Sequence, residues 1–282
     1  MKISVVTTSL NHRRFIEETL ESVRNQSYPD LEHMVMDGGS TDGSVSLLAG
    51  KQGLEWKHLR WSSEADGGQS DAMNQGFRRA TGDAIGWLNS DDRYRPGCLA
   101  AVARAFAEHP EVDVLYGDFT LMDERGTHLR TRREIEFNPL VLLYHRVPHI
   151  PTTATFFRRR IFDEGNFLDE SLHYAMDHEF YVRLALRGYR FRHLSAVLAD
   201  FRLHPGSKTC SMAHKQLEER RLALQRHAPL LQRLQPGISR TLCVAGLQIA
   251  AGAARYGEKL WRGYYLPEWI EQARGSSLKE KV

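Results

Sequence analysis

The first 125 or so residues alternate between short apolar runs and amphipathic segments. Strands are predicted in the runs KISVVTTS, LEHMVMD, EWKHLRWSSE, DAIGWLNSDD and VDVLYGDFTLMD. Between the first two runs, Phe15, Ile16, Leu20 and Val23 recur at helical spacing. This alternation of strands and helices predicts an α/β fold, with a mostly parallel sheet that helices cover on both faces.

The pattern loosens after residue 130. HIPTTATFFRRRIF predicts an edge strand and a turn, and FRHLSAVLADFRLH predicts one or two further strands. MDHEFYVRLALRGY predicts an amphipathic helix that ends at Gly188, and residues 208–282 predict helices broken near Pro229, Pro236 and Pro267. The longest apolar stretch, residues 242–254, contains a Gln and is too short for a membrane span, which needs about 20 apolar residues. We expect it to form a buried helix.

Composition and charge indicate an ordinary globular protein. Charged residues make up 26% and hydrophobic residues 41% of the 282 positions, and the net charge of +3 is too weak to predict a nucleic-acid partner. The three cysteines have no metal-ligand spacing, and their odd number argues against a disulfide framework. The N-terminal residues become polar too early for a signal peptide. We expect a cytoplasmic protein, with peripheral contact at the inner face of the membrane left open.

Four polar clusters follow predicted strands, namely TTS, DGGSTDG, SEADGG and NSDD. In an open α/β sheet, ligands bind at the edge formed by the carboxyl ends of the strands. Each cluster alone is equally typical of a helix cap, as Asp37 in its Gly-rich turn illustrates. Neither the dinucleotide-binding fingerprint nor a phosphate-binding loop with its lysine is present. The four clusters together predict a ligand site of another kind.

The adjacent carboxylates Asp91 and Asp92 suit a divalent cation. Mg²⁺ and Mn²⁺ prefer hard oxygen ligands, typically one or two carboxylates together with the phosphates of a substrate. Such a cation neutralises charge on a departing diphosphate. The alternative is that both residues open the helix at Pro96, where its dipole favours negative charge.

The ordered motifs VVTTSLNH, VMDGGSTDGS, SEADGGQSDAMNQG, ATGDAIGWLNSDD, MDHEFYVRLALRGY and FRLHPGSKT resemble family 2 of the glycosyltransferases, which has the GT-A fold. The resemblance covers about residues 1–210. It implies a Rossmann-like catalytic domain over residues 1–207, with a nucleotide-binding part (1–118) and a part that holds the acceptor and the catalytic base (119–207). A C-terminal helical extension would follow over residues 208–282.

The resemblance implies a metal site after the fourth predicted strand. The family's Asp-X-Asp motif corresponds to Asn89-Ser90-Asp91, so the first acid is an amide here. Asp91 would contact Mn²⁺ or Mg²⁺ on the nucleotide diphosphate. Asp92 would support the site from the second coordination shell, without direct contact to the metal. His204 matches a histidine that completes the metal shell in some relatives, although a lone His before Pro is as often structural.

The resemblance also implies contacts to the nucleotide. Thr8 corresponds to a residue that contacts the nucleoside in relatives. Many relatives carry two aspartates after the second strand, and the second binds uracil; here Asp37 is retained and Gly38 replaces its neighbour. Asp66 and Asp71 are expected near the base and ribose, although Asp71 is equally typical of the first turn of a helix. A uridine nucleotide is the expected type.

Asp177, in AMDHEF, corresponds to the family's catalytic base, and Met176 replaces the acid that precedes it. A carboxylate at a helix N-terminus can take the proton of an attacking hydroxyl. Attack from the face opposite the diphosphate inverts the sugar without the covalent intermediate that a retaining enzyme needs. A simple helix cap is the alternative role for Asp177, and Glu179 is the alternative base.

The resemblance therefore implies an inverting transferase of EC class 2.4. It would move a sugar from a nucleotide-diphosphate donor to a hydroxyl of a glycan or lipid-linked glycan, in cell-surface polysaccharide or glycolipid assembly. Two alternatives stay open. Asn89, Gly38 and Met176 leave room for a nucleotide-binding module with weak or lost catalysis. A sugar nucleotidyltransferase is the other, although TTSLNH is not the Gly-rich basic loop that it would carry.

The tail lies beyond the resemblance and carries the basic excess. Residues 205–282 hold 13 Lys and Arg against 6 Asp and Glu, and Trp261, Tyr264, Tyr265 and Trp269 cluster near the end. Basic residues beside such aromatics are typical of contact with an anionic membrane surface. A helical lid or an oligomer face with a solvated basic side is the alternative, and the sequence does not decide between them.

Overall fold

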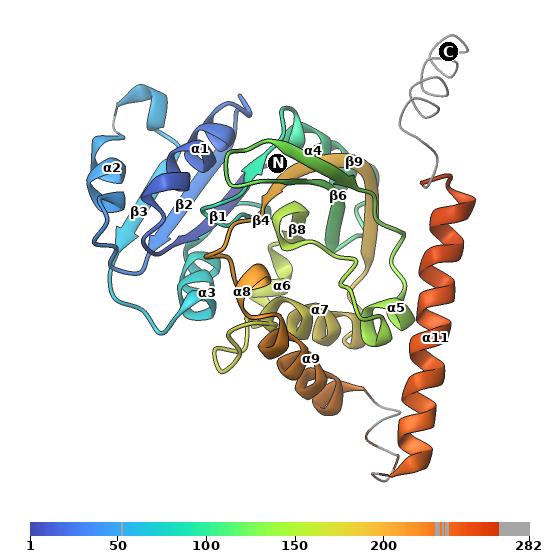
Figure 1. Cartoon of the computed structure of the whole chain (residues 1–282). Coiled ribbons are helices and arrows are strands. Elements are labelled where there is room, and N and C mark those ends of the chain that lie inside the picture. The colour runs from blue at the N-terminus through green and yellow to red at the C-terminus, as the bar shows by residue number, and fades with distance from the viewer. Residues whose placement is uncertain (52, 229–231, 233, 235–236, 265–282) are drawn as a thin grey trace.

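The computed structural model describes residues 1–264, apart from residues 52, 229–231, 233, 235 and 236. Its centre is one nine-stranded sheet in the order β3-β2-β1-β4-β8-β6-β9-β5, with β7 paired to β6 (Figure 1). The strands are β1 (Ile3–Ser9), β2 (Leu31–Asp37), β3 (Leu59–Ser63), β4 (Ala84–Trp87), β5 (Arg93–Tyr94), β6 (Val114–Met122), β7 (His128–Arg132), β8 (Thr155–Arg158) and β9 (Phe191–Arg202).

Helices connect these strands and extend the chain beyond them. They are α1 (Arg13–Arg24), α2 (Ser44–Gly50), α3 (Gln69–Arg79), α4 (Cys98–Glu108), α5 (Pro139–Tyr144), α6 (Arg160–Asp163), α7 (Met176–Leu186), α8 (Lys208–Ser211), α9 (Ala213–His227) and α11 (Ile238–Trp261). Two 3-10 turns, η1 (Leu54–Trp56) and η2 (Thr152–Ala154), complete the assignment.

The N-terminal half of the sheet is parallel, as the sequence predicts. β1 pairs in parallel with β2 and β4, and β2 pairs in parallel with β3. In this register Ser9 lies opposite Asp37, and Asp37 lies opposite Ser63. The polar residues that end three separate strands therefore meet at one rim of the sheet.

The second half of the sheet is mixed. β8 pairs antiparallel with both β4 and β6, so it lies in the middle of the sheet and not at the edge that the sequence pattern indicates. Its buried residues Thr155, Phe156 and Phe157 explain this position, because a central strand is covered on both faces. Within FRHLSAVLADFRLH, one long strand forms, β9, which ends at Arg202 and pairs in parallel with β6.

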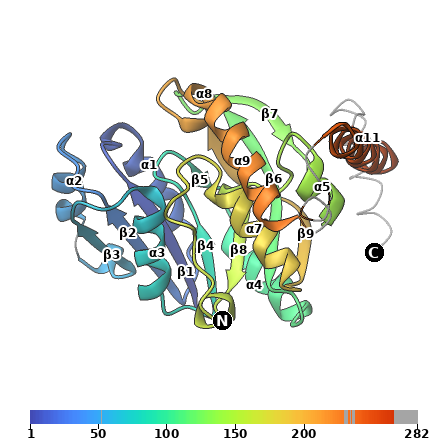
Figure 2. The same ribbon diagram turned by 90° about the horizontal axis from the view of Figure 1, so that it is seen from below.

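Helices cover both faces of the sheet, which confirms the predicted fold class (Figure 2). Consecutive strand residues alternate between the two apolar cores. Val6 and Phe157 belong to the core that includes side chains of α3, α6 and α7, whereas Val5 and Phe156 belong to the core with α1 and α4. The four apolar residues that predict the first helix are all buried on α1.

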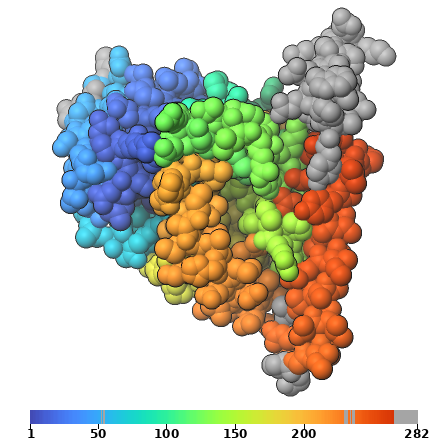
Figure 3. Space-filling model, viewed as in Figure 1, coloured from blue at the N-terminus to red at the C-terminus, as the bar shows by residue number. Residues whose placement is uncertain are grey.

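The C-terminal helices lie against the second half of the domain. Figure 3 shows residues of α8 and α9 (orange) between the N-terminal part (blue) and α11 (red-orange). α11 packs on α5 and is anchored by Arg255, whose Nη2 lies 2.6 Å from Oε2 of the buried Glu134. The described residues do not include Pro229, Pro236 and Pro267, near which helix breaks are predicted. They also do not include Tyr265 and Trp269 of the C-terminal aromatic cluster.

The expectation of a buried helix over residues 242–254 is wrong. α11 buries Ala251, Arg255 and Lys259 against the domain, while Leu242 is 67% and Ile249 is 74% exposed. The helix contacts the domain along one stripe only, so its apolar composition does not lead to burial. No helix in the described part of the chain combines the length and apolar character that crossing a membrane requires.

Candidate active site

A cavity of about 420 Å³ opens at the rim where the parallel strands end. Its wall is built by β1, the loop before α3, the turn after β4, the start of α7 and the segment around α8. The site residues Thr8, Asp66, Asp91 and Asp177, which the sequence predicts, all line it. Four side chains from distant parts of the chain therefore share one cavity.

Asp91 lies between this cavity and His204. The carboxylate Oδ2 of Asp91 is 3.0 Å from Nε2 of His204, and the His204 side chain is only 8% exposed. The ring of Phe15 packs against the imidazole at a centroid distance of 4.7 Å and so limits its movement. His204 itself is not among the residues that line the cavity.

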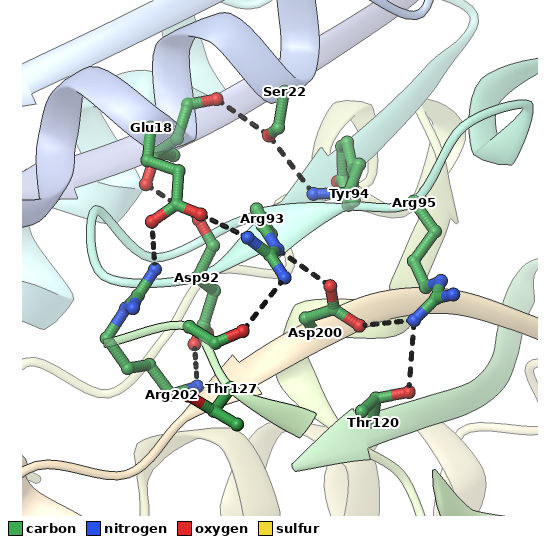
Figure 4. A network of polar contacts seen from close by, with 12 residues as sticks. Glu18, Ser22, Asp92, Arg93, Tyr94, Arg95, Thr120, Thr127, Asp200 and Arg202 are labelled. Carbon is green, nitrogen blue, oxygen red and sulfur yellow. Dashed lines mark hydrogen bonds and ion pairs between the residues drawn. The ribbon is translucent and has the colours of Figure 1, made fainter. Parts of the chain in front are cut away.

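Asp92 faces away from the cavity, into the network of polar contacts in Figure 4. Its Oδ1 accepts the main-chain N–H of Arg202 at 2.9 Å. The buried guanidinium of Arg202 donates to the carbonyl of Asp91 at 2.8 Å and pairs with Glu18, which also pairs with Arg93. Burial, and next the adjacent Asp91 carboxylate, raise the pKa of Asp92 well above its ordinary value. Asp92 thus holds the turn in shape behind Asp91.

Asn89 has a structural reason to be an amide. Its Oδ1 accepts hydrogen bonds from Nε2 of Gln69 and Nε1 of Trp87, both at 3.1 Å. Its Nδ2 donates to Oδ2 of Asp92 at 3.3 Å. A carboxylate in this position could accept but not donate, and it would place a third acid beside Asp91 and the buried Asp92, whose pKa is already raised.

The protein alone offers few metal ligands at the cavity. Within residues 1–264 as described, no group of three or more His, Cys, Asp or Glu side chains converges to hold a metal ion. Asp91 on the cavity wall and His204, which contacts Asp91 but does not line the cavity, offer one carboxylate and one imidazole, a pair that suits Mn²⁺ better than Mg²⁺. The residues fit a cation that also takes oxygens from a bound diphosphate, the mode in which few protein ligands suffice.

Asp66 occupies the space that a side chain at position 38 would need. A Cβ on Gly38 would lie 2.8 Å from Oδ2 of Asp66, closer than such atoms approach. The other oxygen, Oδ1, accepts the N–H of Gly68 at 2.8 Å, which fixes the carboxylate at the cavity wall. The missing second aspartate after β2 is therefore matched by a carboxylate that reaches the same place from the loop before α3.

Two other predicted nucleotide residues do not line the cavity. The buried carboxylate of Asp37 accepts the N–H of Ser40 at 3.0 and 3.2 Å and so closes its own Gly-rich turn. Asp71 accepts the N–H of Gly67 at 2.8 Å from the first turn of α3. Their contacts to a nucleotide stay predictions, because the geometry gives both carboxylates local structural bonds.

Asp177 stands in the first turn of α7 with its side chain on the cavity wall. Its Oδ1 accepts the N–H of His178 at 2.7 Å. Burial raises the pKa of Asp177, and the hydrogen bond from His178, together with the positive charges of Arg220 and Lys208, opposes that shift only in part. A carboxylate with a raised pKa can accept a proton more readily than an ordinary Asp.

The alternative base Glu179 is already engaged. Its side chain is 3% exposed, forms an ion pair with Arg183 at 2.8 Å and lies 2.8 Å from Nε2 of His227. It is not among the residues that line the cavity. The geometry therefore favours Asp177 as the carboxylate that faces a substrate.

Several residues on the cavity wall were not predicted from the sequence, namely His12, Gln69, Tyr174, Lys208 and Gln216. Lys208 spans the opening, because its Nζ donates to Oε1 of Gln69 at 2.9 Å and to the carbonyl of His173 at 2.8 Å. Nδ1 of His12 lies 2.7 Å from Oγ of Ser90, beside Asp91. A signal was present for His12, which ends the motif VVTTSLNH, but none pointed to Gln216 in the mostly polar segment that forms α9.

Comparison with known sequences supports a single family. Residues 4–165 match the sequence model described as Glycosyl transferase family 2. An uncharacterized glycosyltransferase of Mycobacterium tuberculosis strain H37Rv is 37% identical over 188 residues, which are 65% of this chain and 69% of that protein. A PGL/p-HBAD biosynthesis glycosyltransferase of Mycobacterium bovis BCG is 31% identical over 183 residues, which are 64% of this chain and 68% of that protein.

Two solved structures share the fold. TarS 1-349 of S. aureus, in complex with UDP-GlcNAc, superposes with a TM-score of 0.65 at 19% identity and covers 90% of this chain and 73% of its own. The mannosyltransferase PcManGT of Pyrobaculum calidifontis, in complex with GDP-Man and Mn²⁺, gives a TM-score of 0.55 at 18% identity. That match covers 100% of this chain and 88% of the mannosyltransferase. At such identities the likeness concerns the fold alone.

Proposed function

The chain belongs to glycosyl transferase family 2, and from this premise we propose that it transfers a sugar, with inversion, from a nucleotide-diphosphate sugar to a hydroxyl acceptor. The observation that carries the proposal is that Asp91 and Asp177 line one cavity. The carboxylate of Asp91 suits the diphosphate of a donor and its metal, and that of Asp177 suits the attacking hydroxyl.

Uridine is the proposed nucleoside. Thr8 and Asp66 form the part of the wall that is contributed by β1 and by the loop before α3. A carboxylate fixed in this position, as Asp66 is by the N–H of Gly68, can accept a hydrogen bond from an imide N–H, which uracil has and cytosine lacks. The fold is shared with both the TarS complex with UDP-GlcNAc and the PcManGT complex with GDP-Man, so the uridine proposal rests on Asp66.

The proposed cofactor is Mn²⁺ or Mg²⁺, held by Asp91 and, for Mn²⁺, His204. The cation would supply positive charge against the two phosphates of the donor. Asp92 is bonded to Arg202 and Asn89, and its proposed contribution is to hold the Asp91 turn in position. Lys208, which also lines the cavity, would add a positive charge of the protein's own.

Asp177 is the proposed base. Its carboxylate takes the proton from the acceptor hydroxyl while that oxygen forms a bond to the anomeric carbon of the sugar. The bond between the anomeric carbon and the diphosphate oxygen breaks on the opposite face, and its electron pair leaves with the nucleoside diphosphate. The sugar is inverted because bond formation and bond breaking occur on opposite faces.

The main alternative is a module that binds nucleotide without catalysis, which is suggested by three positions where this chain departs from the family motifs. Each has a structural account that leaves the site intact. Gly38 makes room for Asp66, Asn89 donates to Asp92, and Met176 is 6% exposed within the apolar core. We therefore favour an active transferase over a module that only binds nucleotide. A nucleotidyltransferase is likewise not favoured, since its basic Gly-rich loop is absent from residues 7–12.

The acceptor is proposed to be a glycan or lipid-linked glycan, met at the inner face of a membrane. α11 offers an exposed apolar face on which Leu242, Ile249, Leu260 and Trp261 are each at least 66% exposed. Exposed apolar residues in a basic segment suit an anionic bilayer. Cosedimentation with vesicles that contain or lack phosphatidylglycerol tests this contact, and equal recovery in both supernatants would contradict it.

The decisive experiment for the donor is calorimetric titration with UDP, GDP, dTDP and CMP, each with Mn²⁺, Mg²⁺ or a chelator. We expect UDP to bind with Mn²⁺ and not with the chelator. Binding that ignores the metal, or a preference for another nucleotide, would contradict the proposed donor. Release of UDP from UDP-sugars then reports turnover directly.

A further inference from the structure

A carboxylate of α9 holds the loop that leads into the helix of Asp177. Glu219 accepts the N–H of His173 at 3.0 and 3.1 Å, that of Tyr174 at 2.7 Å and that of Ala175 at 2.8 Å. Three consecutive main-chain donors thus converge on one side chain, 44 to 46 residues away in the chain. Carboxylates bind N–H groups more strongly than neutral acceptors do.

This carboxylate supplies a cap that the sequence of α7 lacks. The N-cap residue of α7 is Ala175, which has no side chain that could accept a hydrogen bond, and no side-chain cap is formed there. The N–H groups at and before a helix start need partners from elsewhere, because they have none inside the helix. Glu219 provides these partners and places its negative charge where the helix dipole favours it.

The loop that Glu219 holds carries part of the cavity wall. Tyr174, Met176 and Asp177 all line the cavity, and so does Gln216, one turn before Glu219 on α9. Movement of residues 173–175 would displace Tyr174 directly and would shift the first turn of α7, on which Asp177 stands. The geometry of the proposed base therefore depends on a residue outside the region that matches the family, residues 4–165.

α9 does not depend on Glu219 alone for its position. Arg226 pairs with Asp169 at 3.0 Å, and His227 pairs with Glu179 at 2.8 Å. These contacts lie two turns further along α9 and join it to the same part of the domain. Removal of the Glu219 carboxylate should therefore loosen the loop without detaching the helix.

We propose that Glu219 is a positioning residue for the transfer reaction, one that fixes residues 173–175 so that Tyr174 and Asp177 face the acceptor. The proposal rests on the proposed role of Asp177. By this proposal, α9 of the C-terminal part helps to form the acceptor side of the site.

The test uses the full-length chain with Glu219→Ala and Glu219→Gln, and with Glu218→Ala at the exposed neighbouring position as the matched control. Hydrogen exchange at the amides of residues 173–175 should accelerate about tenfold or more in Glu219→Ala, since bonds to a charged acceptor are lost. Glu219→Gln, which keeps an oxygen acceptor, should show a smaller effect. Unchanged exchange in Glu219→Ala would overturn the proposal.

Turnover separates a positioning role from a purely structural one. The rate of UDP release from UDP-GlcNAc should fall about 100-fold in kcat for Glu219→Ala, with the donor KM and the affinity for UDP unchanged. Glu219→Gln should recover part of that rate, and Glu218→Ala should match the wild type. Full kcat in a folded Glu219→Ala, or an equal loss of UDP affinity, would overturn the proposal. If the wild type turns over no UDP-sugar or GDP-mannose while exchange responds as expected, the proposed function fails and the role of Glu219 in the loop stands.

Discussion

Nε2 of His204 lies 3.0 Å from Oδ2 of Asp91, although 113 residues separate them in the chain. One belongs to the turn after β4 and the other follows β9, and the sheet brings both to the same rim. The pair joins the proposed contact of the diphosphate and metal, Asp91, to a histidine for which the sequence allowed either a ligand role or a structural role. Two side chains are too few to hold a cation alone, so we expect the cation to bind together with the nucleotide.

Replacement of Asp91 should therefore weaken metal-dependent nucleotide binding. In Asp91→Asn the imidazole can still form a hydrogen bond, so the turn should remain folded, but the charge opposite the cation is lost. Titration of UDP with Mn²⁺ measures the effect. We expect at least a tenfold loss of affinity, about 1.4 kcal/mol, and wild-type affinity in this variant would contradict the assigned role.

Replacement of Asp177 should leave nucleotide binding intact and remove turnover. Asp177→Asn keeps the shape of the side chain but cannot take a proton, so kcat should fall about 10²–10⁴-fold, the usual contribution of a general base. The folded state raises the pKa of Asp177, so its ionised form is destabilised by folding and stability falls as pH rises through that pKa. Thermal unfolding at neutral pH should consequently show Asp177→Asn at least as stable as the wild type.

The pH dependence of turnover should reveal the raised pKa of Asp177. The base must be ionised, and burial keeps it protonated to a higher pH than an ordinary Asp, whose pKa is about 3.9. As pH falls, kcat/KM should decline at a pH clearly above that value. The residual rate of Asp177→Asn serves as the control and should lack this acid limb; the same limb in both proteins would assign it to another group.

Gly38→Ala should disturb Asp66 and weaken nucleotide binding. The added Cβ would lie 2.8 Å from Oδ2 of Asp66, so the carboxylate must move. Overpacking of this kind costs about 1–3 kcal/mol, and we expect UDP affinity to fall about tenfold or more. Gly50→Ala is the matched control, because a Cβ there meets nothing within 4 Å. Equal UDP affinity in both variants would remove Asp66 from the nucleotide site.

Asn89→Asp, which restores the acid of the family motif, should destabilise this protein. The amide donates to Asp92 at 3.3 Å, and a carboxylate would replace that bond with repulsion between two acids. The expected loss in free energy of unfolding is about 1–3 kcal/mol. It should be larger at pH 7 than at pH 5, since protonation relieves the repulsion, and denaturant unfolding at both pH values measures it. A variant as stable as the wild type at pH 7 would contradict this account of Asn89.

Several features of the molecule were determined by local sequence. The period of apolar residues predicted α1 and the parallel strands, because burial on one face of a helix or both faces of a strand leaves that pattern in any context. The polar clusters at strand ends predicted the rim that holds Thr8, Asp66 and Asp91, since parallel strands all end at one edge. Asp177 required the additional resemblance of its motif to the family.

Tertiary structure decided what depends on residues distant in sequence. The central position of β8 follows from its partners β4 and β6, and the exposure of α11 follows from the single stripe along which it meets the domain. Asp91 and Asp92 are neighbours with the same side chain, yet one faces the cavity and the other faces Arg202. Glu219 shows the same limit, since its bonds to three main-chain N–H groups join segments more than 40 residues apart. A sequence pattern records which side chains are apolar and how they are spaced, whereas a contact between distant segments exists only once packing has fixed their positions.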